Sequence, residues 1–411
     1  MRTVGIVVEY NPLHNGHLYH IQQSRKITGA DAVVAVMSGH FLQRGEPALA
    51  DKWARTEMAL RAGCDLVLEL PVAYSAQPAQ WFAYGAVAVL EATGVVDALC
   101  FGSESGELAP LLRIARLLAE EPQALSGRLS GLLKAGLPYP SAYSEAVRSY
   151  LSDAGLAVDA GFRLDQPNHT LGLHYLLALL RLGSSIEPFS IRREKSGYNQ
   201  TTITDRRIAS ATALRKLLSE RAEVAALAPY VPASTLDILA REAAAGRAPV
   251  TWESFARPLL HRLLQSREAD LAAFAEVTEG LEFRIRQSLR TLPEYSVEAL
   301  LAALKTKRYT RTKLQRMLLR ILLGHRKDEL APERLASGIE YIRVLGFGEK
   351  GRELLRRMKK TAAVPVIQSA AEGDWPYLRL DAEATALYSL AFDAPAPADA
   401  WRDYTRPPVR V

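Results

Sequence analysis

Two histidines, His14 and His17, flank Gly16 shortly after an apolar run at residues 4–8. The β-branched run is typical of a strand buried on both faces of a parallel sheet, and residues 18–26 have helical spacing. A strand that leads into a helix start leaves backbone N–H groups free to bind phosphate. Imidazoles there would stabilise the charge that grows on the α-phosphate of ATP as pyrophosphate leaves, without a covalent step. The stretch therefore predicts a site for nucleotide chemistry at phosphorus.

Two other interpretations of the histidines stay open. His14, His17 and His20 are three residues apart and could bind a metal ion, although no Cys or carboxylate stands nearby at ligand spacing. The pair could also be purely structural, but strand, turn, glycine and helix follow one another as a phosphate motif requires. We therefore predict no metal site, and we predict His14 and His17 as the catalytic residues.

The H-x-G-H pattern, preceded by an aromatic-x-Pro, resembles the signature of the nucleotidyltransferase superfamily, which also contains the class I aminoacyl-tRNA synthetases. Tyr10, Pro12, His14, Gly16 and His17 match this signature. Val8 departs from it, because many relatives carry a small residue at that position.

A second motif lies about two hundred residues further on, at Ile208 to Arg215. Hydroxyls at a helix start, with a basic residue one turn later, can hold the β- and γ-phosphates. Ser210, Thr212 and Arg215 resemble by position the second superfamily signature, I-S-S-T-x-[IL]-R, from which Ala209 and Ala211 depart. An ordinary capped helix is the alternative.

The elements that must position these motifs alternate between strands and helices, which predicts an α/β fold with a parallel sheet. Ligands of such sheets bind beyond the carboxyl ends of the strands, where four loops are expected to converge. Gly102 could admit a nucleotide against bare backbone, Asn168 could simply cap a helix, and Arg193 belongs to a basic cluster after the fifth strand. Further strands are expected at residues 32–37, 66–70, 98–101 and 186–191, and helices at 51–62, 80–92 and 171–182.

Three more basic residues, Arg44, Lys52 and Arg55, are expected near the same edge of the sheet. Lys52 and Arg55 are better explained as solvated surface charges, since Lys and Arg are mostly exposed. Arg44 is the better candidate for the site, because it lies in a loop that needs no charge to fold.

The composition limits the class of protein. The chain has 411 residues, is 48% hydrophobic, carries a net charge of +6 and has a pI near 9.2. This length favours two domains, and the mild excess of positive charge suggests a polyanionic partner if the charge is clustered. Cys64 and Cys100 suit buried thiols in a reducing compartment. With no signal peptide and no apolar stretch near twenty residues, we expect a cytoplasmic protein with no membrane partner.

The second half, residues 221–411, is expected to be an all-helical domain that follows a nucleotide-binding catalytic domain at 1–220. Residues 305–327 contain no Asp or Glu, and a helix there would place Leu314 and Met317 on an apolar stripe opposite a cationic ridge. Such a ridge suits a sugar–phosphate backbone, although charged runs are usually only solvated faces. The predicted nucleic-acid-binding residues are Lys305, Lys307, Arg308, Arg311, Lys313, Arg316 and Arg320.

Residues 346–351 match G-x-G-x-x-G. A dinucleotide site needs a buried strand before the first glycine, and Arg343 interrupts the apolar run there, so we expect a turn between two helices. From residue 370 onward the chain is acidic and then rich in Pro and Ala, which indicates a loosely ordered tail.

Longer phrases resemble the bacterial tRNA(Met) cytidine acetate ligase family, over residues 1–368. They lie at residues 8–17, 37–39, 43–48, 101–104 and 305–310. The resemblance implies that acetate and ATP form acetyl-adenylate and that the acetyl group passes to N4 of the wobble cytidine of elongator tRNA(Met). It also implies ATP binding by Val7, Val8, Glu9, Tyr10, Asn11, Pro12, Leu13, His14, Asn15, Gly16, His17, Leu18, Tyr19, His20, Gly102, Asn168 and Arg193, beside Ser210, Thr212 and Arg215 from the second motif.

Mg²⁺ is expected to accompany ATP on the grounds of phosphoryl-transfer chemistry alone, because no dedicated carboxylate pair is visible. Two rival functions remain. One is a small-molecule adenylyltransferase of cofactor biosynthesis, and the other is a tRNA-binding protein whose nucleotide site serves regulation.

Overall fold

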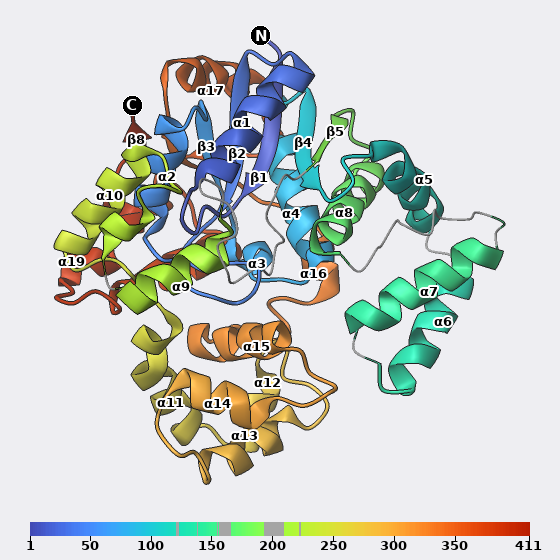
Figure 1. Cartoon of the computed structure of the whole chain (residues 1–411), viewed down its shortest axis with the longest axis vertical. Coiled ribbons are helices and arrows are strands. Elements are labelled where there is room, and N and C mark those ends of the chain that lie inside the picture. The colour runs from blue at the N-terminus through green and yellow to red at the C-terminus, as the bar shows by residue number, and fades with distance from the viewer. Residues whose placement is uncertain (121–122, 138, 154, 156–165, 193–208, 222) are drawn as a thin grey trace.

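The computed structural model describes residues 1–120, 123–137, 139–153, 155, 166–192, 209–221 and 223–411 (Figure 1). Its centre is an eight-stranded sheet in the order β5-β4-β1-β2-β3-β6-β7, with β8 paired to β6. The strands are β1 Thr3–Val8, β2 Ala32–Ser38, β3 Leu66–Leu70, β4 Ala98–Ser103, β5 Glu187–Arg192, β6 Ile342–Phe347, β7 Val366–Ile367 and β8 Val409–Arg410.

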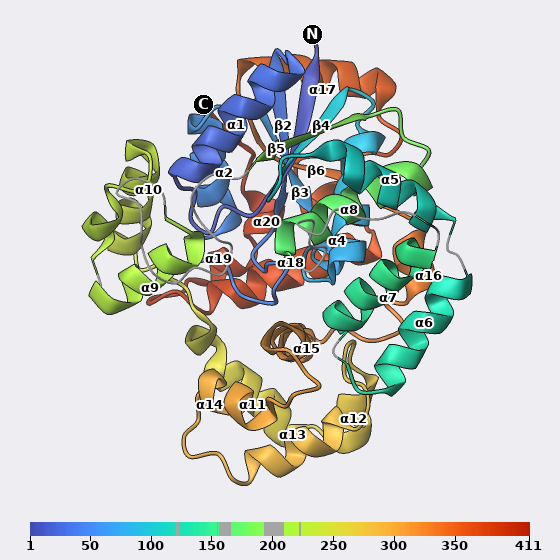
Figure 2. The same ribbon diagram turned by 45° about the vertical axis from the view of Figure 1, so that its right-hand side comes forward.

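The five strands expected in the first half are confirmed, and β5, β4, β1, β2 and β3 pair in parallel. Alternate residues of β2 pack on opposite faces of the sheet. Val34 and Val36 belong to one apolar cluster, and Val33 and Ala35 belong to the other. Helices therefore cover both faces of the sheet, as Figure 2 shows. The helices of this half are α1 Asn15–Thr28, α2 Lys52–Arg61, α3 Val72–Ser75, α4 Ala79–Ala92, α5 Leu108–Ala119, α6 Gln123–Lys134, α7 Tyr139–Asp153, α8 Pro167–Arg181 and α9 Ala211–Arg221.

The strand order changes direction at β1. The chain runs outward through β2 and β3, and then returns to place β4 on the other side of β1. The loops that follow β1 and β4 therefore diverge and leave a crevice at the carboxyl ends of these strands. This is the place where the topology allows a ligand to bind.

The expectation of an all-helical second half is wrong. Strand β6 pairs antiparallel with β3, and β7 and β8 extend the same sheet. Residues 256–323 alone form a helical lobe, below the sheet in Figure 1. The remaining elements are η1 Val224–Leu227, α10 Ala233–Ala244, η2 Trp252–Phe255, α11 Ala256–Gln265, α12 Glu268–Ala273, α13 Leu281–Leu289, α14 Val297–Leu304, α15 Arg311–Leu323, α16 Pro332–Ala336, α17 Glu349–Thr361, η3 Ala370–Glu372, α18 Pro376–Ser389, α19 Pro397–Ala400 and α20 Arg402–Thr405.

The G-x-G-x-x-G segment also differs from the expected turn between two helices, because it joins β6 to α17. Its glycines are explained by packing. The Gly348 N–H donates to the Asp65 carbonyl at 2.9 Å, and a Cβ on Gly351 would lie 2.0 Å from the same oxygen. The protein's own loop therefore fills the space that a dinucleotide phosphate would need.

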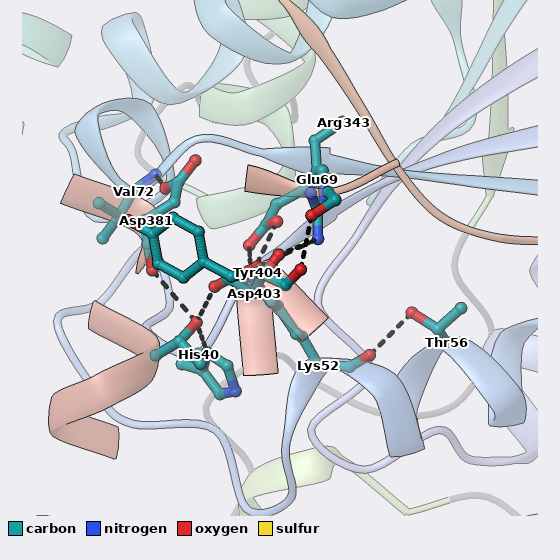
Figure 3. Close-up of polar contacts among 12 residues, drawn as sticks. His40, Lys52, Thr56, Glu69, Val72, Arg343, Asp381, Asp403 and Tyr404 are labelled. Carbon is teal, nitrogen blue, oxygen red and sulfur yellow. Dashed lines mark hydrogen bonds and ion pairs between the residues drawn. The ribbon is translucent and has the colours of Figure 1, made fainter. Parts of the chain in front are cut away.

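The C-terminal segment is not a loose tail. Helix α18 is largely buried, and Asp403 in α20 is buried among polar contacts with Lys52 and Arg343 (Figure 3). Lys52 Nζ, which is fully buried, lies 2.8 Å from Asp403 Oδ1 and 2.7 Å from Glu69 Oε1. Burial alone would lower the pKa of Lys52, but these two carboxylates raise it. Arg343 of β6 also contacts Asp403, at 3.4 Å. The cluster ties the end of the chain to α2, β3 and β6.

Candidate functional site

A cavity of about 240 Å³ lies at the carboxyl ends of β1, β4 and β5. Both sequence motifs contribute to its wall. From the predicted site it takes Val7, Val8, Glu9, Tyr10, Asn11, His14, Gly16, His17, Tyr19, His20, Gly102, Asn168, Ser210, Thr212 and Arg215. Pro12, Leu13, Asn15 and Leu18 of the predicted segment are not among the lining residues, and Arg193 lies outside the described residues.

The two histidines are stacked, with ring centroids 3.7 Å apart. His14 precedes α1 as its N-cap, and its Nδ1 accepts a hydrogen bond from the Gly16 N–H at 3.1 Å. His17 Nδ1 in turn accepts from the His14 N–H at 3.3 Å. A neutral imidazole that accepts at Nδ1 carries its proton on Nε2. The start of α1 therefore orients two Nε2–H donors through one capping arrangement.

The second motif meets the first at this cavity. Ser210 Oγ caps α9 by accepting from the Ala213 N–H at 3.0 Å. Arg215, one turn into α9, donates from Nη1 to the Asn11 carbonyl at 3.0 Å and from Nη2 to Glu46 at 3.2 Å. The capped-helix interpretation of this motif is confirmed by the Ser210 bond, and the phosphate-site interpretation stays a prediction for residues that line the cavity, Ser210, Thr212 and Arg215.

Gly102 of β4 and Asn168 of α8 also line the cavity. The Asn168 backbone N–H and side-chain Nδ2 both donate to Glu104 Oε1, at 3.0 and 2.8 Å. Glu104 also accepts from the His169 N–H at 2.7 Å, so its carboxylate caps the start of α8. Asn168 therefore does not cap α8 through its own side chain, which lines the cavity instead.

Most of the apolar wall of the cavity was not predicted from the sequence. These residues come from α4, β4, α8 and β5 and form a surface suited to a flat, uncharged group. Their pattern does not differ from that of the core, so no signal in the sequence distinguished them. They are Phe82, Phe101, Leu171, Tyr175 and Ile191.

Of the three further basic residues, only Arg44 lines the cavity. The prediction that Lys52 and Arg55 are surface charges is wrong, since both are at most 1% exposed. Arg55 donates to the carbonyls of Glu9 at 2.7 Å and Ser38 at 3.0 Å, and to that of Gly39. Burial lowers the pKa of Arg55. Arg55 therefore fixes the ends of β1 and β2, from which the cavity loops depart.

Glu9 belongs to the cavity wall, and burial raises the pKa of its carboxyl group. Its Oε1 accepts from the Gln43 N–H at 2.8 Å and from the Ser38 hydroxyl at 3.2 Å. Glu9 thus joins the end of β1 to the loop at residues 42–47. Glu46 of that loop accepts from Gln315 of α15 at 3.2 Å, so the same loop connects the cavity to the helical lobe.

The basic segment at residues 305–320 is less exposed than its sequence suggests. Lys305, Lys307, Arg308 and Arg311 are exposed, but Arg308 pairs with Glu279 at 2.7 Å and Arg311 with Glu298 at 2.5 Å. Lys313 and Arg316 both contact Glu276, at 3.1 and 2.8 Å. The cationic surface of this segment therefore lies mainly before and at the start of α15.

The prediction of Arg320 as a tRNA-binding residue is wrong, because its side chain is fully buried. It donates to the carbonyl of Val72 at 3.3 Å, to that of Ala76 at 2.5 Å and to His325 Nδ1 at 2.8 Å. Burial lowers the pKa of Arg320 to about 10. Arg320 thus anchors α15 to α3 and to Ala76, which directly follows α3.

The same anchor makes stability depend on pH. Burial, and then the nearby Arg320 charge, hold the pKa of His325 well below 6.5. The unfolded chain takes up a proton at that position below about pH 6.5 and the folded chain does not, so stability falls as the pH falls. His325→Gln keeps an acceptor for Arg320 but cannot titrate. In urea unfolding between about pH 7.5 and 5.5, we expect this variant to lose less stability than the parent chain. Equal losses would contradict this role.

The chain is similar to known proteins over nearly its full length. The family model of the HIGH Nucleotidyl Transferases matches residues 1–402. The tRNA(Met) cytidine acetate ligase of Acetivibrio thermocellus is 40% identical over 99% of both chains, and that of Bacillus subtilis is 40% identical over 100% of this chain and 97% of the relative. No described helix is long and apolar enough to cross a membrane.

Two crystal structures of Thermotoga maritima TmcAL cover 100% of both chains. The apo form is 37% identical, with a TM-score of 0.93, and the form bound with alpha-thio ATP is 36% identical, with a TM-score of 0.90. Identity of this extent over the full length establishes homology and not only a shared fold. The chain therefore belongs to the tRNA(Met) cytidine acetate ligase family of the HIGH nucleotidyl transferases.

Proposed function

We propose that this protein is an ATP-dependent ligase that activates acetate as acetyl-adenylate and acetylates N4 of the wobble cytidine of elongator tRNA(Met). The observation that carries the proposal is the meeting of both motifs, His14 to His17 and Ser210 to Arg215, at one cavity. The names of the full-length relatives and the ATP analogue in one homologous structure support it.

ATP would lie along the cavity from β4 toward α9. The apolar side chains of Phe82, Phe101 and Tyr175 suit the adenine ring, and Gly102 and Asn168 are adjacent to them. At the other end, the start of α9 and Arg215 offer N–H, hydroxyl and guanidinium donors to the β- and γ-phosphates. Mg²⁺ would arrive with the triphosphate. No cluster of three metal-ligating side chains occurs in the described ranges, so phosphate oxygens and water would supply most of its ligands.

The attack of acetate on ATP needs no general base, because acetate is already ionised at neutral pH. An acetate oxygen attacks the α-phosphorus, the bond to the β-phosphate oxygen breaks, and pyrophosphate leaves. The Nε2–H groups of His14 and His17 would donate to the phosphate oxygens, where charge grows in the transition state. The cytidine N4 amine then attacks the acetyl carbonyl, the bond from the carbonyl carbon to the AMP oxygen breaks, and the amine loses one proton to solvent as AMP leaves.

Incubation of the purified protein with ATP, labelled acetate and total tRNA tests the proposal. Label in tRNA supports the ligase. A cofactor-like dinucleotide product would support a small-molecule adenylyltransferase, and binding of ATP and tRNA without turnover would support a regulatory protein. Either of the last two results would overturn the proposal.

The exposed segment before α15 is the proposed tRNA contact. Replacing Lys305 and Lys307 together with Ala is expected to weaken binding of every tRNA, because phosphate contacts carry no sequence information. The slope of log K against log salt should fall by about 1–2, as one contact per lysine predicts. Replacing the exposed Lys359 and Lys360 of α17 in the same way is the control, since α17 lies at the opposite end of the molecule in Figure 1. Equal effects of the two double variants would contradict the placement.

A further inference from the structure

One acidic side chain of the cavity wall already pairs with a donor that the proposed function assigns to ATP. Glu46 Oε2 accepts from Arg215 Nη2 at 3.2 Å, and both side chains line the cavity. Their exposed fractions are 27% and 26%, so the pair is not sealed from the cavity. A carboxylate and a phosphate offer a guanidinium the same kind of acceptor, paired anionic oxygens that match its forked N–H groups. The carboxylate therefore stands where an anionic ligand would bind.

The ion pair belongs to the part of the cavity wall that carries the second motif. The same Arg215 Nη2 lies 3.5 Å from Thr212 Oγ1, a hydroxyl proposed to bind the β- and γ-phosphates. Arg215 Nη1 is held separately, because it donates to the Asn11 carbonyl at 3.0 Å. The guanidinium can therefore exchange the partner of Nη2 while Nη1 keeps it in place.

Glu46 keeps a second partner if Arg215 is withdrawn. Its Oε1 accepts from Gln315 Nε2 of α15 at 3.2 Å, and Gln315 is buried. The main chain of Glu46 is fixed as well, since its carbonyl accepts from the Leu42 N–H at 2.9 Å. Release of Arg215 would thus strand no buried charge. A partly exposed ion pair also contributes little to stability, so a ligand of higher negative charge can displace the carboxylate.

We infer that Glu46 is an internal competitor of the distal phosphates: its carboxylate pairs with Arg215 in the ATP-free protein and gives up Nη2 when the triphosphate binds. The inference rests on the proposed function and names a residue that tunes the affinity of its nucleotide site. The same exchange runs in reverse after the adenylate has formed. Glu46 takes Nη2 back as pyrophosphate leaves, so its carboxylate lowers the affinity for this product.

Calorimetric titration of the full chain with the α,β-methylene analogue of ATP, with pyrophosphate and with AMP tests the inference. Glu46→Gln keeps an acceptor for Gln315 but removes the carboxylate. The Kd values of the analogue and of pyrophosphate should each fall about three- to fivefold, because the ligand no longer has to displace a partly exposed ion pair. The Kd of AMP should change less than about 1.5-fold, because AMP has no distal phosphate to compete for Arg215.

Two further variants separate this role from general effects. In an Arg215→Gln background, Glu46→Gln should no longer tighten binding of the analogue, because a competitor acts only through the partner that it shares with the ligand. Glu57→Gln removes the same charge from another ion-paired glutamate, which lies 2.8 Å from Arg241 and does not line the cavity. It should leave all three Kd values unchanged.

An unchanged or raised Kd of the analogue in Glu46→Gln would overturn the inference, and a rise would mean that Glu46 assists the triphosphate, directly or through Mg²⁺. An equal fall in the Kd of AMP would also overturn it, since a general change in charge would then explain the result. If Arg215→Gln alone left the Kd of the analogue unchanged, the phosphate role of Arg215 in the proposed function would fail, and the competition with it. Thermal unfolding of each variant separates loss of fold from altered binding.

Discussion

His17→Ala is expected to lower the rate of acetate-dependent ATP–pyrophosphate exchange by about 10²–10³-fold, the usual cost of removing one donor that acts on transition-state charge. The fall should appear in kcat, with little change in the KM for ATP, because the donor acts mainly as charge develops. His14→Ala should have an effect of the same order on the rate. It should also cost about 0.5–2 kcal/mol of stability, because His14 caps α1.

His261→Ala is the control for this result, since His261 is an exposed histidine of α11 outside the cavity. It should keep full exchange activity. If His17→Ala kept more than about a tenth of the parent rate, the donor role assigned to the imidazole would be wrong. A fall in rate that tracked a fall in the unfolding midpoint would point to damaged folding instead.

Lys52→Met is expected to produce the largest loss of stability, about 3–5 kcal/mol, because it leaves the buried Glu69 carboxylate without its ion-pair partner and leaves Asp403 with only the 3.4 Å contact to Arg343. Glu69 and Asp403 are each 3% exposed, and neither can reach water to compensate. Burial already raises the pKa of Glu69, with Lys52 opposing that rise. Unfolding in guanidinium chloride, followed by circular dichroism, measures the change.

Lys216→Met removes the same type of side chain from an exposed pair, in which Lys216 and Glu220 are 53% and 60% exposed. Its expected cost is at most about 0.5 kcal/mol. A loss below about 1 kcal/mol for Lys52→Met would show that the cluster in Figure 3 does not hold the C-terminal segment in place.

The sequence was sufficient to predict those strands and motifs whose signal lies within a few neighbouring residues. The runs that became β1 to β5 are apolar on both faces, as central parallel strands must be, and their order along the chain limits the topology. The histidine motif and the hydroxyl-rich helix start were also predictable, because in each the backbone N–H groups of the helix start are bonded by side chains only a few residues away. That they line one cavity follows from the fold, not from either motif.

Strand β6 was missed because its stability depends on a distant partner. Arg343 interrupts the apolar pattern, and its side chain is accommodated by Asp403, 60 residues further along the chain. A period-based argument cannot anticipate that pairing, nor the antiparallel contact between β6 and β3. The composition of the C-terminal segment was misleading for the same reason, since its ordering depends on tertiary contacts.

Buried charges were the other source of error. Lys52, Arg55 and Arg320 were each assigned to a surface, because isolated Lys and Arg are mostly exposed. In the structure Arg55 and Arg320 bind main-chain carbonyls of other segments, and Lys52 binds two carboxylates. Long-range partners of this kind leave no periodic trace in the sequence.

In the proposed reaction, a carboxylate oxygen attacks the α-phosphorus of ATP at this cavity. Acetate labelled with ¹⁸O on both oxygens tests it most directly, with the AMP released after acetyl transfer to tRNA analysed by mass spectrometry. We expect one ¹⁸O atom in each AMP, because the attacking oxygen stays on phosphorus when the acetyl group leaves. Unlabelled AMP, or label in inorganic phosphate together with release of ADP, would contradict it.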